Sequence, residues 1–146
     1  MNIQIKNKVD SNYFDTFLSY KKEGYKIYCH PFFKEYLEVN SLNILSTITK
    51  ETLIHKSVVN VTFEKKINVK NPFGFSSIII KKSRHRSFLN FIISLLKKSK
   101  AKQAFDAACH LIHHNLDTPL PIGYIEKKRL GFLVECYFIT ESVKPF

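Results

Sequence analysis

The stretch FSSIIIKK, residues 75–82, decides the fold, because it is the strongest strand signal in the chain. It joins three consecutive isoleucines to two lysines, and β-branched residues favour strands. Side chains alternate across a strand, so Lys81 and Lys82 are expected on opposite faces of a sheet. Only one of these two lysines can therefore face a given site.

The segments before this strand predict a mixture of short elements. Phe14, Phe17 and Leu18 have helical spacing, which predicts a helix over residues 11–22 that stops at Gly24. Pro31 suits the first turn of a helix over 31–39. Strands are expected at 2–6, 25–29, 44–49, 52–63 and 67–69, followed by a turn at 71–74.

After residue 82 the spacing of the apolar residues changes from that of a strand to that of a helix. Apolar spacing predicts a helix over 87–98 and a second helix that begins after the cap Ser99 and stops near Asn115. Strands are expected at 122–126 and 132–141. Strands, then helices, then two more strands indicate an α+β fold with a mainly antiparallel sheet.

Composition excludes several classes of protein. The chain has 146 residues, 45% of them hydrophobic, with 13 Phe and 7 Tyr against 4 Gly and 5 Pro, so it is not expected to be disordered. Three distant cysteines do not indicate a disulfide scaffold, and a reducing cytoplasm is the expected compartment. The longest apolar stretch, residues 88–96, is too short for a membrane span, which needs about 20 residues.

The formal charge of +11 predicts an acidic or phosphorylated partner, such as nucleic acid, an anionic membrane surface or a phosphorylated small molecule. Eight basic residues lie between positions 81 and 102, where there is no Asp or Glu. A second basic cluster spans 127–129. A solvated basic face that keeps the protein soluble is the alternative interpretation.

Short signatures for nucleotide loops, zinc sites and hydrolases are absent from the sequence. A strand that ends in Lys81, followed by a helix that carries Asp106, is how a kinase brings an ammonium group to ATP phosphates. The alternatives are a solvated lysine and a surface pair between Lys102 and Asp106. The histidines at 110, 113 and 114 share a helix face, but they fit a helix C-terminus better than a metal site, and we predict no metal ligand.

Several motifs together resemble the lipopolysaccharide core kinases, the Kdo and heptose kinase family, which is related to protein kinases. They are SKAK at 99–102, FD at 105–106, DTPLPIGYIE at 117–126 and YFITE at 137–141, together with Lys81-Lys82. The convincing part covers residues 76–141, and residues 1–75 match loosely. Asn115 replaces the usual helix-stop glycine, and no glycine-rich phosphate loop is recognisable.

The resemblance implies a kinase-like N-terminal lobe, with an antiparallel sheet and two helices, that binds ATP with Mg²⁺. Lys81 would contact the α- and β-phosphates, and Asp106 would orient Lys81. Some relatives carry that acid two positions earlier, which corresponds to Ala104. Backbone groups of Glu141 and Val143 would meet adenine.

The resemblance also implies a division of the chain into an N-terminal extension at 1–50, a kinase-like lobe at 51–141 and a hinge stump at 142–146. The C-terminal lobe, which carries the catalytic Asp and the magnesium ligands of kinases, is expected to be missing, so we predict no catalytic residue and no activity of the chain alone.

Complete relatives phosphorylate a core sugar at the inner face of the inner membrane. The expected partners are a phosphorylated glycolipid or the anionic inner-membrane surface, and a separate C-terminal lobe. The expected location is the cytoplasm, peripheral at that membrane. The alternative function is a basic, non-enzymatic module for nucleic acid or an anionic membrane surface, and nucleic acid is the less favoured partner because most aromatic residues have core spacing.

Overall fold

The computed structural model describes residues 12–45, 53–56, 60–67, 74, 76–84, 98–130 and 132–142. The predicted strand at 2–6, most of the strands at 44–49 and 67–69, most of the turn at 71–74 and most of the helix at 87–98 lie outside these residues. None of the described helices is long and apolar enough to cross a membrane.

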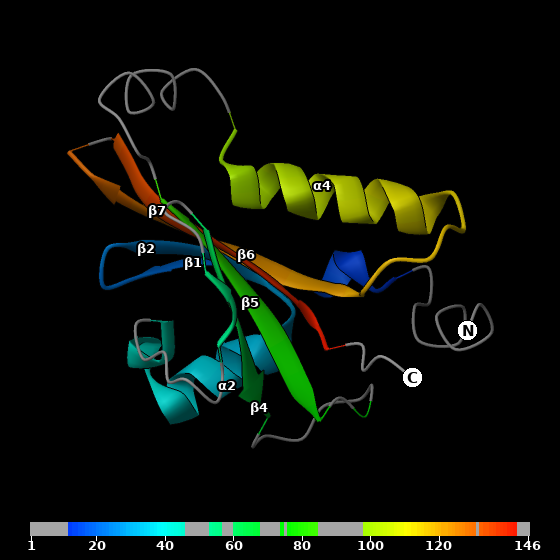
Figure 1. Cartoon of the computed structure of the whole chain (residues 1–146), viewed down its shortest axis with the longest axis horizontal. Helices are drawn as coiled ribbons and strands as arrows, with labels where there is room; N and C mark the ends of the chain where they lie inside the picture. The colour runs from blue at the N-terminus through cyan, green and yellow to red at the C-terminus, as the bar shows by residue number, and fades with distance from the viewer. Residues whose placement is uncertain are drawn as a thin grey trace.

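Within the described residues, seven antiparallel strands form a single sheet in the order β1-β2-β6-β7-β5-β4-β3 (Figure 1). Their bounds are β1 (Leu18–Lys22), β2 (Tyr25–Cys29), β3 (Leu53–Lys56), β4 (Asn60–Lys66), β5 (Ser77–Arg84), β6 (Pro121–Arg129) and β7 (Phe132–Glu141). The fold is therefore α+β with an antiparallel sheet, as the order of elements predicted. β2 pairs directly with β6 and β1 pairs with β2, so these two strands from the first 50 residues belong to the same sheet as the rest.

Of the α-helices that the structure describes, α2 (Pro31–Asn40) lies on one face of the sheet and α4 (Lys100–His113) on the other (Figure 1). Pro31 opens α2 as expected, and the His30 side chain accepts a hydrogen bond from the backbone N–H of Phe32. Ser99 caps α4 by accepting from the backbone N–H of Lys102, and Asn115 has a positive φ of 58° at the stop. These boundaries confirm the expected caps.

Two segments differ from the sequence predictions. The helix expected over 11–22 is wrong, because only η1 (Phe14–Thr16) is a short 3-10 helix and Leu18–Lys22 is an edge strand. Glu23 and Gly24 both have positive φ, which makes the tight turn that pairs β1 with β2. The strand expected from residue 44 is replaced at its start by a second 3-10 helix, η2 (Leu42–Leu45). The long strand over 52–63 divides into β3 and the first part of β4.

The core has two parts, one on each face of the sheet. The α2 face buries Phe33 and Leu37 of the helix against Ile27, Ile80 and Ile125 of the sheet. The α4 face buries Ala101 and Phe105 against Tyr124, Leu133 and Cys136. The alanines let α4 approach the sheet closely, and Phe105 fills the space between them.

Gly123 shows why one position of β6 needs a glycine. A Cβ there would lie 2.5 Å from the carbonyl oxygen of Tyr28 and 2.7 Å from the Cβ of Cys29, across the β2–β6 pairing. The backbone of β2 cannot move away from such a Cβ atom as a flexible side chain could. The close contact between the N-terminal hairpin and β6 therefore depends on this residue.

Candidate functional site

Lys81 lies on the α4 face of the sheet, in the middle of β5, opposite Phe138 of β7. It lines a pocket of about 180 Å³ between the sheet and the first turns of α4. The other lining residues are Ser83, Lys100, Ala101, Ala104 and Phe138. Two exposed lysines thus flank a small polar hollow, and none of the described residues forms an ion pair with Lys81.

Lys82, the next residue, points to the opposite face and is a structural residue. Its Nζ lies 3.2 Å from Oε2 of Glu135, with the two side chains 6% and 13% exposed. The Tyr137 hydroxyl donates to Oε1 of Glu135 at 2.9 Å, and the ammonium group lies over the Tyr137 ring. Strand alternation therefore separates the two lysines as expected, one buried and paired, the other exposed.

The electrostatics of this buried pair favour an ionised carboxylate. Burial alone would raise the pKa of Glu135, but the hydrogen bond from Tyr137 and the charge of Lys82 outweigh it. The pKa of Glu135 is therefore held below its ordinary value of 4.5.

Asp106 does not meet Lys81. Its Oδ2 lies 3.1 Å from the Nζ of Lys98, in a pair whose side chains are 45% and 61% exposed. Ala104, two positions earlier, lines the Lys81 pocket together with Lys100 and Ala101 of the same helix. The surface pair considered from the sequence thus exists, but with Lys98 in place of Lys102.

Glu141 has a structural role at the end of β7. Its carboxylate accepts a hydrogen bond from the backbone N–H of Leu120 at 3.1 Å, and its own N–H donates to the carbonyl of Leu120 at 3.0 Å. The residue is buried and holds the segment that leads into β6. Val143, the other residue predicted to meet adenine, lies outside the described residues.

The N-terminus of α4 faces a thiol. Cys136 is buried opposite Ser83 and packs in one cluster with Ala101 of the first turn of α4. Burial raises the pKa of this thiol, so it stays neutral at pH 7. Cys136 thus lies beside the first turn of α4, where backbone N–H groups often bind an anion. The charged groups that an anion in the Lys81 pocket would meet are the side chains of Lys81 and Lys100.

The histidines at the end of α4 are exposed, and the His110 and His114 rings lie 4.3 Å apart. The described part of the chain holds no group of His, Cys, Asp or Glu side chains that could bind a metal.

A second hollow on the same face was missed by the sequence analysis. It has a volume of about 410 Å³ and lies where the β1–β2 turn meets the end of β6. Its lining includes Lys21, Lys26, Glu126 and Lys128. The signal for it is the alternation of side chains in residues 18–22, which form a strand that ends at the Glu23-Gly24 turn. The predicted helix over 11–22 hid this signal.

No family model, curated protein or solved structure matches this chain.

Proposed function

We propose that the chain is the ATP-binding N-terminal half of a kinase-like fold, similar to the lipopolysaccharide core sugar kinases, and that it does not transfer phosphate by itself. The observation that carries this proposal is the position of Lys81, which is exposed in a pocket beneath the helix that follows its strand. A lysine there can reach phosphate oxygens of a nucleotide.

The order of elements supports the proposal. In protein kinases the phosphate-binding lysine lies on the third strand of the N-terminal lobe, and the next helix carries its acidic partner. Here β3 and β4 precede the lysine strand β5, and α4 follows it before β6 and β7. The Lys81 strand is central, paired with β4 on one side and β7 on the other.

The size and charge of the pocket define what it can hold. At about 180 Å³ it is smaller than the 300–1,000 Å³ typical of small-molecule sites, so a phosphate group fits and a whole nucleotide does not. Lys81 and Lys100 supply two positive charges. The adenine would lie outside this hollow, toward the end of β7, where the resemblance places Glu141 and Val143.

The same pocket lacks what phosphoryl transfer requires. Kinases need carboxylates that hold magnesium and a carboxylate that accepts the hydroxyl proton. None of the described residues that line the pocket is acidic, so they do not fit a magnesium ion, and Asp106 pairs with Lys98 instead. Transfer to a sugar of a phosphorylated glycolipid would require a second lobe.

The test is ATP binding by calorimetry, with and without magnesium, for the wild type and Lys81→Ala. A hydrogen bond between charged groups contributes about 1.5–3 kcal/mol, so the substitution is expected to weaken binding at least about tenfold. Lys66→Ala, an exposed lysine at the end of β4, is the matched control and should bind as the wild type does. Equal ATP binding by Lys81→Ala and the wild type, or none by either, would overturn the proposal.

The alternative, a basic module for nucleic acid or an anionic membrane, has less support. Recognition of single strands uses exposed aromatic rings on which bases stack. The large hydrophobic side chains exposed on the described residues are Leu18, Val39, Leu116 and Leu130, none of them aromatic. Phe105 of α4 and Tyr124 of β6 are instead buried together between α4 and the sheet.

A further inference from the structure

The larger hollow is built by two pairs of strands at the end of the sheet. Lys21 of β1 lies opposite Lys26 of β2, and Lys26 lies opposite Glu126 of β6. Residues directly opposite in an antiparallel pair share a face, so all three side chains project to the same side. Lys128, two positions after Glu126, joins them.

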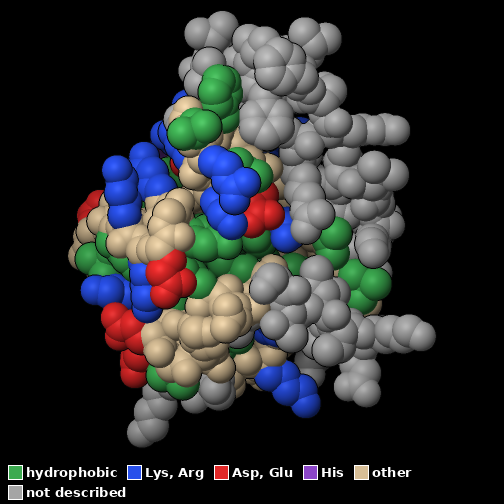
Figure 2. Space-filling model, turned by 90° about the vertical axis from the view of Figure 1, so that its left-hand side faces the viewer, with side chains coloured by type: hydrophobic (Ala, Val, Ile, Leu, Met, Phe, Trp, Pro, Cys, Tyr) green, Lys and Arg blue, Asp and Glu red, His purple; other side chains and the backbone are tan. Residues whose placement is uncertain are grey.

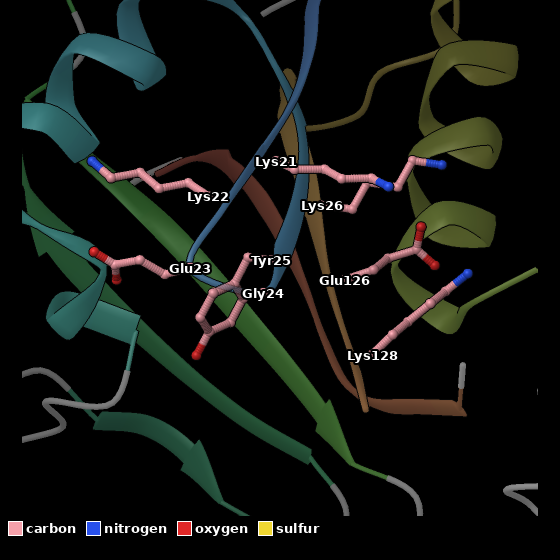
Figure 3. Close-up of a pocket in the computed structure, with 8 residues that line it drawn as sticks. All are labelled: Lys21, Lys22, Glu23, Gly24, Tyr25, Lys26, Glu126 and Lys128. Atoms are coloured by element: carbon pink, nitrogen blue, oxygen red, sulfur yellow. The ribbon is translucent and has the colours of Figure 1, made fainter. Parts of the chain in front are cut away.

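Figure 3 shows how these side chains lie. Lys21, Lys26, Glu126 and Lys128 extend toward α4, whereas Lys22 and Glu23 point the other way. Figure 2, which views the side from which the hairpin turns project, shows basic side chains spread over this face with acidic ones between them. Four lysines and two glutamates line the hollow of about 410 Å³, a net of two positive charges. Three of these lysines and Glu126 extend to the α4 side.

Glu126 is the informative residue of this group. It is only 8% exposed, yet it forms no hydrogen bond or ion pair with any residue in the described part of the chain. Every buried side-chain nitrogen or oxygen in the described part of the chain has a hydrogen-bond partner, so the carboxylate oxygens of Glu126 that lack one reach solvent. The carboxylate points into the hollow, where the hydroxyl groups of a ligand could replace water as hydrogen-bond donors.

We propose that this hollow binds a phosphate monoester that carries hydroxyl groups, such as a sugar phosphate, free or as a lipid headgroup. The three lysines match the charge of a phosphate dianion, and Glu126 accepts hydrogen bonds from the hydroxyl groups. A carboxylate at the centre of a basic site repels a bare anion, so it favours ligands that bring donors as well as charge. A volume of about 410 Å³ lies within the range of small-molecule pockets.

This site is separate from the pocket of Lys81. The two hollows share no lining residue, and the contact of Cys136 with the first turn of α4 lies between them. The inference therefore does not depend on ATP binding, and Lys81→Ala is expected to leave it unchanged.

The experiment is a titration at fixed ionic strength with glucose 6-phosphate, inorganic phosphate and glucose, followed by NMR of the backbone amides. Glucose 6-phosphate should bind more tightly than phosphate, with shifts in the β1–β2 turn and the end of β6, and glucose should not bind measurably. Lys26→Gln should weaken glucose 6-phosphate binding about two- to fivefold, the range of a partly exposed charge pair. Lys66→Gln, an exposed lysine at the end of β4 that lines neither hollow, is the control and should bind as the wild type does.

The Glu126→Gln variant tests whether the hollow recognises the hydroxyl groups of a ligand or only attracts anions. It should strengthen phosphate binding and lower the preference for glucose 6-phosphate over phosphate about two- to fivefold. A preference unchanged by this substitution, or no binding of either anion by a folded wild type, would overturn the proposal. Added retention on phosphatidylcholine vesicles that contain phosphatidylinositol phosphate would support a lipid-borne ligand, and binding of the free sugar phosphate alone would support a soluble one.

Discussion

The lysines on the two faces of the sheet differ in burial and in their partners. On the α2 face Lys82 is buried, and Glu135 and Tyr137 satisfy it. On the α4 face Lys81, the adjacent residue, is exposed at the edge of a pocket, and Lys21, Lys26 and Lys128 surround a second one. One face uses its charges for the stability of the fold, and the other leaves them available to a ligand.

This difference shows that the local sequence of a strand does not tell which of two neighbouring lysines is buried and which is exposed. Both belong to the same apolar run, and alternation says only that they separate. Their roles follow from the residues opposite them on β7, which are Tyr137 for Lys82 and Phe138 for Lys81. The predictions below test whether stability and binding divide between the two faces in this way.

The largest effect is expected from Glu135→Gln. The substitution leaves the Lys82 ammonium group buried without its counter-charge, and breaking a buried ion pair in this way costs about 3–5 kcal/mol of unfolding free energy. Urea unfolding measures it. Lys81→Gln on the exposed face is the control and should change stability by no more than about 0.5 kcal/mol. Equal effects of the two substitutions would contradict the division between the faces.

Lowering the pH is expected to have a smaller effect on the free energy of unfolding. The pKa of Glu135 in the folded protein lies below its ordinary value of 4.5, so the stabilisation from its ionised form is fully present above that value. It is lost as the pH falls through the lowered folded pKa. Unfolding measured from neutral pH downward should therefore show the gap between the wild type and Glu135→Gln narrowing below about pH 4.5. A gap that stays constant to low pH would argue against this electrostatic origin.

The smallest effect is expected from Asp106→Asn. The Lys98–Asp106 pair is about half exposed, and such pairs contribute at most about 0.5 kcal/mol. Because Asp106 faces Lys98 and not the pocket, ATP binding should also be unchanged in the calorimetric assay. A clear loss of ATP affinity would show that Asp106 does reach Lys81 when nucleotide is bound, as the kinase resemblance implied.

Much of the fold could be predicted from local patterns. Pro31, Ser99 and Asn115 marked helix boundaries correctly, since caps depend on residues close in sequence. The prediction of a helix over 11–22 was wrong because the spacing of Phe14 and Phe17 does not come from a helix. Both pack against Phe105 of α4, a contact between distant segments that no local pattern contains.

The candidate sites were harder to predict. Lys81 was found from a strand signal, but its neighbours Lys100 and Ala104 depend on where α4 crosses the sheet. The group around Glu126 needed both the β1–β2 hairpin and its pairing with β6, which the predicted helix concealed. Strand register over long separations is thus the missing information in both cases.

The strand order also has a consequence for how the chain folds. β6 and β7 are late in the sequence, yet they lie between β2 and β5 in the sheet. The β1–β2 hairpin can form early, but it has no place to dock until β6 has been synthesised, and Ile27 then meets Ile125 across a long loop. Such distant pairings slow folding, because the loop must close before any contact compensates for the lost entropy. During translation the edge of β2 that pairs with β6 is therefore expected to stay unpaired until residues 121–129 have been synthesised.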